Sequence, residues 1–172
     1  MSKSLVGFVI DTLEFAREGR SVSGTVAVSA LPRLLELLGE SVLCLQTLNC
    51  TLTGRQGRDG NWLRLQVDGQ FDLSCQRCLG PLPFVVALDT ELQVIAPGQP
   101  WPDEELEDGT TRLGADAIAA DPALVVTDLI EEEVLLALPI APKHENDCVP
   151  PVRSDEQQSV SPFAVLAQMK KH

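Results

Sequence analysis

The most regular hydrophobic pattern in the chain flanks two closely spaced cysteines. From residue 63 to residue 73, apolar side chains recur at every second position except at one glycine, which is the period of a half-buried β-strand. A second alternating segment covers residues 84–94. The turn between them carries Cys75 and Cys78, and Gly80 follows two residues later. We therefore expect an antiparallel hairpin whose closed end, here called the cysteine knuckle (residues 75–80), aims both thiols at one point.

Shorter patterns predict further elements before this hairpin. They are a strand or buried segment at residues 5–10, a short helix at 12–17, a strand at 22–28, a helix at 32–39 and a strand at 42–53. Pro32 fits the first turn of its helix and Gly39 fits the end. The alternation shifts phase near residues 46–47, which suggests a β-bulge. The glycine-rich residues 54–61 read as a plain hairpin connection.

One longer helix is predicted after the hairpin, at residues 127–138. Its apolar residues recur every four positions on one face. Thr127 or Asp128 would cap its first turn. The three consecutive glutamates at 131–133 would form its charged, solvent-facing side. Prolines just beyond then end the helix and keep the following chain extended.

These elements predict an α+β fold. An antiparallel sheet or meander, which could also close into a barrel, would carry the cysteine knuckle and pack against a few short helices. We expect one domain at residues 1–148 with an acidic loop near 97–114. A linker at 149–160 and a short C-terminal helix at 161–172 would follow. The apolar face of that last helix could pack on the domain or on a partner.

Charge narrows the choice of partners. The formal net charge is −12, and residues 96–172 hold 15 of the 25 acidic side chains but only 5 of the 13 basic ones. Nucleic-acid binding draws its affinity mainly from Lys and Arg neutralising phosphates. The acidic half would repel RNA, so we favour a protein partner, and a basic one. With no long apolar run and no cleavage pattern, we expect a cytoplasmic protein.

The cysteines point to a metal site. Five cysteines are an odd number, which suits reduced thiols better than a disulfide framework. Tetrahedral Zn²⁺ takes four N or S ligands, commonly as two pairs from separate segments. Cys75 and Cys78 supply one pair, and His144 and Cys148 could supply the second. A turn without metal and a thioredoxin-like dithiol remain open alternatives, whereas Cys44 and Cys50 read as small buried residues.

Three segments together resemble the YceD family of large ribosomal RNA subunit accumulation proteins. They are LSCQRCLGPLPF around the knuckle, DLIEEEVLLALPIAPKH after the acidic stretch, and SPFAVLAQMKK at the end. The likeness extends from about Val42 to the last residue. It implies a bacterial cytoplasmic factor needed for the synthesis, processing or stability of 23S rRNA, with no enzymatic mechanism. The family motif also points to Cys75, Cys78, His144 and Cys148, whereas zinc is inferred from ligand chemistry.

Three functional hypotheses follow. The first is a non-enzymatic factor that acts through ribosomal or rRNA-processing proteins on the pre-50S particle, with one structural Zn²⁺ and an undetermined oligomeric state. The second is a thiol-disulfide oxidoreductase using Cys75 and Cys78. The third is a zinc protein that contacts RNA directly, and it needs four arginines on one face: Arg55, Arg58, Arg64 and Arg77. We detect no nucleophile–base constellation for other chemistry.

Overall fold

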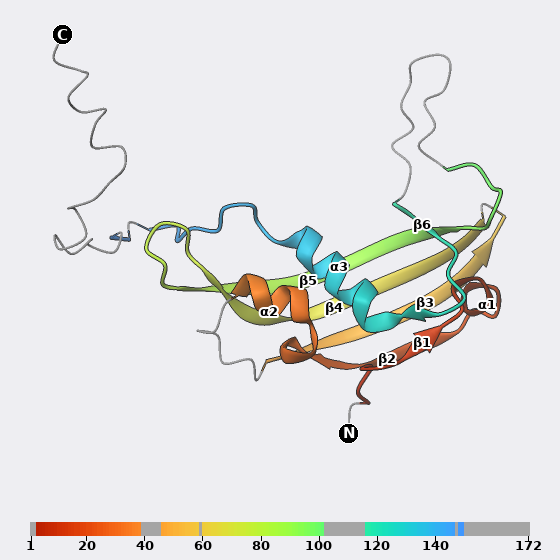
Figure 1. Cartoon of the computed structure of the whole chain (residues 1–172), viewed down its shortest axis with the longest axis horizontal. Helices are drawn as coiled ribbons and strands as arrows, with labels where there is room; N and C mark the ends of the chain where they lie inside the picture. The colour runs from red at the N-terminus through yellow and green to blue at the C-terminus, as the bar shows by residue number, and fades with distance from the viewer. Residues whose placement is uncertain (1–2, 39–45, 59, 102–115, 147, 150–172) are drawn as a thin grey trace, which may run out of the picture.

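A five-stranded sheet forms the centre of the protein, seen here in a computed structural model that describes residues 3–38, 46–58, 60–101, 116–146 and 148–149 (Figure 1). The strand order is β2-β3-β4-β5-β6, antiparallel except for the last pair. The sheet strands are β2 (Ser21–Ala27), β3 (Thr47–Gly57), β4 (Gly60–Ser74), β5 (Pro81–Ile95) and β6 (Ala117–Ala119). A second sheet has only two strands, β1 (Val9–Ile10) and β7 (Leu124–Val125).

The hairpin of β4 and β5 confirms the predicted alternation. Its register runs without a break from the Asn61↔Val94 pair to the Ser74↔Pro81 pair. The alternate apolar side chains of β4 are buried, and the series is interrupted only at Gly69: Leu63, Leu65, Val67, Phe71 and Leu73. Because β-strand side chains alternate between faces, this register places the apolar set on one face and the polar set on the other.

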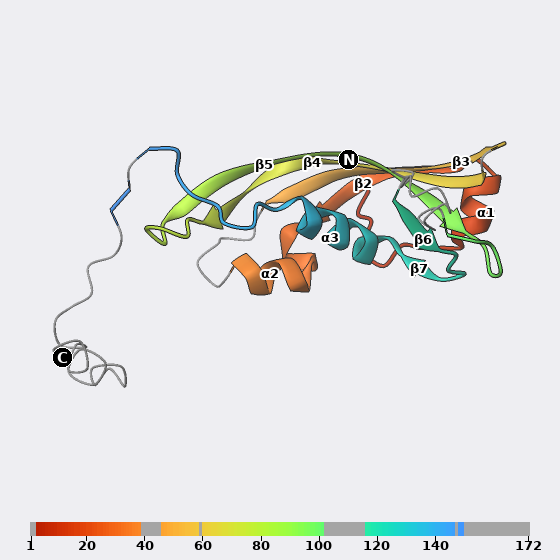
Figure 2. The same cartoon turned by 90° about the horizontal axis from the view of Figure 1, so that it is seen from above.

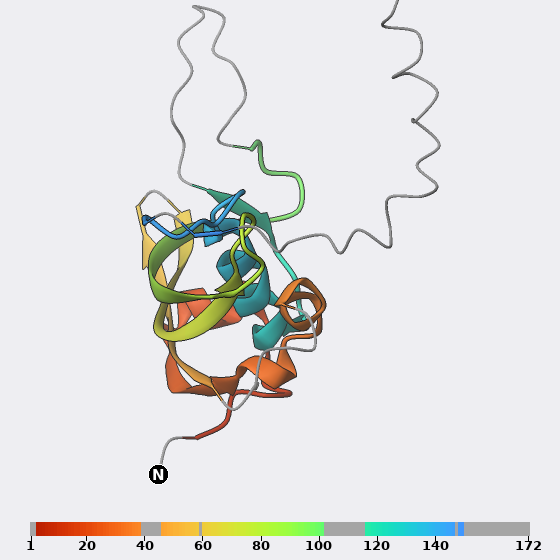
Figure 3. The same cartoon turned by 90° about the vertical axis from the view of Figure 1, so that its left-hand side faces the viewer.

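The helices cover one face of the sheet and leave the other uncovered among the described residues (Figure 2). Helices α2 (Pro32–Leu38) and α3 (Val126–Ala137) lie on the apolar face, and the sheet curls around α3 (Figure 3). Helix α1 (Thr12–Arg17) has the predicted bounds and packs at the end of the sheet opposite the cysteine knuckle. The core joins leucines and valines of the sheet to both covering helices.

Strands β3 and β4 extend through most of the segment that we expected to be a loop. β3 continues to Gly57 and β4 starts at Gly60. Gly54 therefore lies inside β3, where its N–H donates to the carbonyl of Arg20 at 2.8 Å. A Cβ at Gly54 would collide with the Phe15 carbonyl oxygen. The glycine is thus explained by the close approach of α1 rather than by a turn.

The predicted capping of α3 by Thr127 or Asp128 is wrong. The N-cap residue is Val125, and no described side chain hydrogen-bonds the start of the helix. The physical reason is that the chain enters α3 directly from β7. The N–H of Val126 donates to the carbonyl of Phe8 at 2.9 Å, so backbone replaces a side-chain cap.

The prediction that Glu131 belongs to an outer charged face is also wrong. Glu131 is 4 % exposed, and its Oε1 accepts a hydrogen bond from the backbone N–H of Leu34 at 3.0 Å. Leu34 lies in the first turn of α2, where N–H groups lack partners within the helix. Glu131 therefore caps the neighbouring helix, whereas Glu132 is exposed as predicted and Glu133 is half-buried.

The sheet does not close into a barrel within the described part of the chain, because β2 and β6 form its two edges. No helix among these residues is long and apolar enough to cross a membrane. Several expectations lie wholly or partly outside the described residues: the helix end at Gly39, the environment of Cys44, the start of the strand at 42–53, most of the acidic loop, the linker and the C-terminal helix. The domain boundaries therefore stay predictions.

The cap that Glu131 provides can be tested with its exposed neighbour as the control. Glu131→Ala should lower the free energy of unfolding by about 1–3 kcal/mol, because it leaves a buried N–H unpaired. Glu132→Ala should change it by no more than about 0.5 kcal/mol. Chemical denaturation of both variants measures the difference. Equal losses would contradict the assigned role of Glu131.

Candidate metal centre

The cysteine knuckle is a tight turn closed by its own backbone. The N–H of Cys75 donates to the carbonyl of Gly80, and the N–H of Leu79 donates to the carbonyl of Cys75, both at 2.9 Å. Leu79 adopts a φ of 60°, which is uncommon for a residue with a side chain. A Cβ at Gly80 would lie 3.4 Å from the Cys78 sulfur, so glycine leaves this side of the thiol open.

The segment that follows α3 returns to the knuckle. The helix ends at Ala137, before the two prolines of the sequence. The carbonyl of Pro142 then accepts a hydrogen bond from the N–H of Gln76 at 2.8 Å. Two residues later, the Nε2 of His144 lies 3.1 Å from the carbonyl oxygen of Pro81. The knuckle and the segment leaving α3 are therefore joined at two points besides the cysteines.

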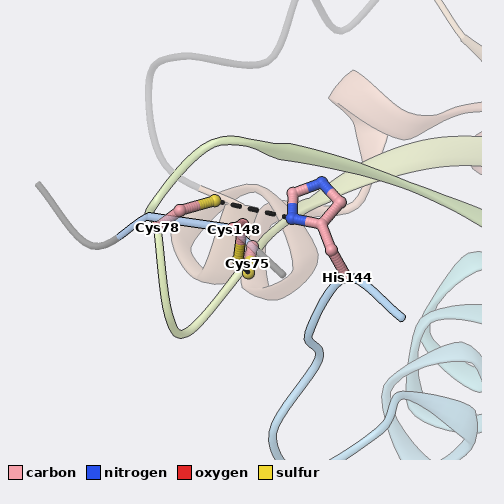
Figure 4. A group of neighbouring side chains, drawn as sticks. All are labelled: Cys75, Cys78, His144 and Cys148. Atoms are coloured by element: carbon pink, nitrogen blue, oxygen red, sulfur yellow. Dashed lines mark hydrogen bonds between the residues drawn. The ribbon is translucent and has the colours of Figure 1, made fainter. Parts of the chain in front are cut away.

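The structure brings all four predicted ligands together (Figure 4). One ligand atom from each of Cys75, Cys78, His144 and Cys148 lies within 4.8 Å of all the others. The Cys75 and Cys148 sulfurs are 3.8 Å apart, and the Cys78 sulfur is 3.5 Å from His144 Nδ1. Zn–S bonds of about 2.3 Å and Zn–N bonds of about 2.0–2.1 Å give tetrahedral edges of about 3.8 Å for S–S and about 3.5 Å for S–N. These two separations thus already fit a tetrahedral S₃N site.

Groups around the four side chains also suit a metal. The His144 Nε2–H donates to the Pro81 carbonyl, which leaves Nδ1 as the free lone pair that faces the sulfurs. The N–H groups of Arg77 and Gly80 each lie 3.4 Å from a knuckle sulfur, those of Cys75 and Cys78 respectively. The N–H of Arg77 favours the thiolate form of Cys75, which is the form that binds metals.

The pKa values of Cys75 and Cys148 shift in opposite directions. Backbone N–H donation, chiefly from Cys78 and then from Arg77 and His144, lowers the pKa of Cys75 to about 5 even though burial opposes it. The pKa of Cys148 is raised, first by burial and then by the two neighbouring knuckle thiols. Of these two thiols, Cys75 is thus the one that ionises more readily.

The remaining sequence candidates lie elsewhere. Cys50 is buried in the core as expected, where burial and then the charge of Asp68 raise its pKa to about 12.

Arg55 and Arg64 lie on the uncovered face of the sheet, but Arg64 forms a two-point ion pair with Asp89. Arg77 lies in the knuckle, at the far end of β4. The four arginines proposed for RNA contact therefore do not form one patch.

Comparison with known protein families identifies the family of this chain. The family described as "Large ribosomal RNA subunit accumulation protein YceD" matches residues 63–170, more than half of the chain. The chain belongs to the YceD family. The YceD match starts at the hairpin, later than the Val42 that the motifs indicated, and it contains all four cluster residues. Searches of curated proteins and of solved structures found no significant match.

Two contacts of the YceD-family site could not be read from the residue pattern. They are the hydrogen bonds from Gln76 to the Pro142 carbonyl and from His144 to the Pro81 carbonyl. Both acceptors are backbone oxygens, which every residue type offers. The only available signal is the pair of prolines after α3, which indicates an extended exit from the helix but not its destination.

The low pKa of Cys75 can be measured in metal-free protein. Thiolate absorbance should appear in a step near pH 5, well below the ordinary thiol value of about 8.5. Since folding lowers this pKa, the thiolate stabilises the fold fully above the ordinary value and loses that effect as the pH falls through about 5. Cys75→Ser should remove the step, and Cys50→Ala should retain it. A first step at the ordinary thiol pKa in the wild type would contradict the assignment.

Proposed function

We propose that this protein is a non-enzymatic factor that supports the accumulation of 23S rRNA during biogenesis of the large ribosomal subunit. Membership of a family described as large ribosomal RNA subunit accumulation proteins supports this assignment. The protein would act in the cytoplasm, through ribosomal or rRNA-processing proteins of the pre-50S particle. The net charge of −12 supports protein partners, because an acidic chain repels RNA phosphates.

In this proposal a single Zn²⁺ has a structural role. Cys75, Cys78, His144 and Cys148 would hold it as a closed S₃N site, the type that leaves no ligand position open for chemistry. The observation that carries the proposal is the convergence of these four ligand atoms within 4.8 Å, from a β-turn and a segment about 65 residues later. The ion would fix the exit of α3 to the end of the hairpin.

An oxidoreductase built on Cys75 and Cys78 fits this site less well. Redox-active dithiols are partly exposed and use a helix N-terminus to lower the thiol pKa. Here Cys75 is buried and Cys78 is partly exposed, but the pair lies in a turn between two strands and not at a helix N-terminus. Direct RNA binding also fits less well, since Arg64 is paired with Asp89 and Arg55 lies 4.0 Å from Glu91.

Protein purified without chelator should contain one zinc ion per chain. Cys75→Ser, His144→Asn and Cys148→Ser should each lose most of the metal, because a tetrahedral site with three protein ligands binds zinc more weakly. Cys50→Ala is the matched control and should retain it. Elemental analysis measures the content. Zinc at the wild-type level in Cys148→Ser, or none in the wild type, would refute the S₃N site.

Deletion of the gene should lower the ratio of 23S to 16S rRNA, and expression of the wild-type chain should restore it. The protein should co-sediment with pre-50S particles, and raising the salt concentration should weaken this association because exposed charges are then screened. Quantitative RNA analysis and gradient sedimentation check the two outcomes. An unchanged rRNA ratio together with absence from the particles would end the proposal.

A further inference from the structure

Among the residues that the structure describes, strand β5 has a free edge along most of its length. β6 pairs only with residues Gln93 to Ile95, at one end (Figure 1). At the other end, the side chain of His144 reaches the carbonyl of Pro81. Residues 83–91 lie between these two contacts. In an extended strand this stretch spans about 30 Å.

The register shows which backbone groups face outward from this edge. The N–H of Gln93 points away from β4, because it donates to the carbonyl of Asp116 at 2.8 Å. In an antiparallel pair, alternate residues direct both N–H and C=O to the same side. The residues in phase with Gln93 are Val85, Ala87, Asp89 and Glu91. No described residue hydrogen-bonds their backbone groups.

The positions of two prolines in β5 are consistent with this assignment of outward-facing residues. Pro81 and Pro83 occupy the next two outward-facing positions toward the knuckle. Proline is tolerated in a sheet where its missing N–H would point off the edge. The prolines therefore block hydrogen bonding beside the metal centre, and the four N–H groups farther along remain open. An open edge of this length is a template for another strand.

Carboxylates flank the free edge on both faces. Asp89 and Glu91 project from β5 on the uncovered face of the sheet. On the helix side, Glu133 of α3 hydrogen-bonds Thr90, with Asp116 and Glu132 nearby. Arg64 and Arg55 balance only the first two of these acids. The edge is thus acidic overall, within a chain of net charge −12.

We propose that the free edge of β5 accepts an extended basic segment of a partner protein as an additional strand. This inference rests on the proposed function, in which the partners are proteins of the pre-50S particle. Backbone hydrogen bonds would hold the segment. Its basic side chains would lie on the uncovered face, where Asp68 and Asp72 of β4 are opposite Ala87 and Pro83. Its alternate apolar side chains would lie beside the half-buried Phe84 and Leu88. Pairing with a second copy would instead set like charges against each other.

Hydrogen exchange of the free protein gives the first test. The amides of Val86, Leu88 and Thr90, which bond to β4, should be protected, whereas those of Val85, Ala87, Asp89 and Glu91 should exchange fast. If the second set is already protected, another part of this chain occupies the edge and the proposal fails.

The second test adds a probe. An end-capped nine-residue peptide of alternating lysine and valine should protect the amides of Val85, Ala87, Asp89 and Glu91. The same peptide with every backbone amide N-methylated keeps its charge but cannot pair as a strand. Equal binding of the two peptides, or no protection at millimolar peptide, would overturn the proposal.

A matched pair of variants isolates the backbone contribution. Ala87→Pro removes one outward N–H without touching a β4 bond, and the native Pro83 already occupies an equivalent position. It should weaken peptide binding about tenfold or more. Ala87→Thr keeps the N–H and favours the strand, so it should bind as the wild type does. Equal affinity of both variants would contradict strand addition.

The two Ala87 variants also distinguish a failure of this inference from a failure of the proposed function. If deletion of the gene leaves 23S rRNA unchanged, the proposed function fails, whatever the peptide does. If the wild type and Ala87→Pro both restore 23S rRNA and co-sediment equally, the proposed function stands and the inference fails. Restoration by Ala87→Thr but not by Ala87→Pro supports both.

Discussion

The unbroken register of the β4–β5 hairpin sets both the packing of the core and the position of the cysteine knuckle. The pairing is continuous from Asn61↔Val94 to Ser74↔Pro81, without a bulge. The register therefore fixes which face each side chain occupies and which way each backbone group points. It buries the apolar residues against α2 and α3. It also places the cysteine knuckle at one end of the hairpin and directs alternate N–H groups of β5 toward the free edge.

The knuckle needs support that the hydrophobic core does not provide. Two large apolar side chains beside it, Leu79 and Ile140, are exposed. What joins the turn to the segment leaving α3 is polar: the Gln76–Pro142 and His144–Pro81 hydrogen bonds and the four clustered ligand atoms. In small or peripheral substructures, a metal commonly supplies the stability that burial cannot. A zinc ion at this junction would therefore act on the fold rather than on a substrate.

The strands and helices could be predicted from the sequence where the residue pattern depends on one element alone. The alternation of residues 63–73 predicts β4, and the bounds of α1 were predicted correctly. Predictions failed where two elements meet. Glu131 looks like part of a charged outer face until α2 is packed beside it, and Gly54 looks like a loop residue until α1 approaches. The four clustered residues could be predicted because few residue types suit zinc, whereas the backbone contacts that orient them carry no residue signature.

In our proposal, three sulfurs and one nitrogen of this chain bind a single zinc ion at the end of the hairpin. X-ray absorption at the zinc edge of the purified protein would show this shell. We expect three sulfurs at about 2.3 Å and one nitrogen at about 2.0–2.1 Å. A shell of oxygen and nitrogen alone, or one with only two sulfurs, would contradict it.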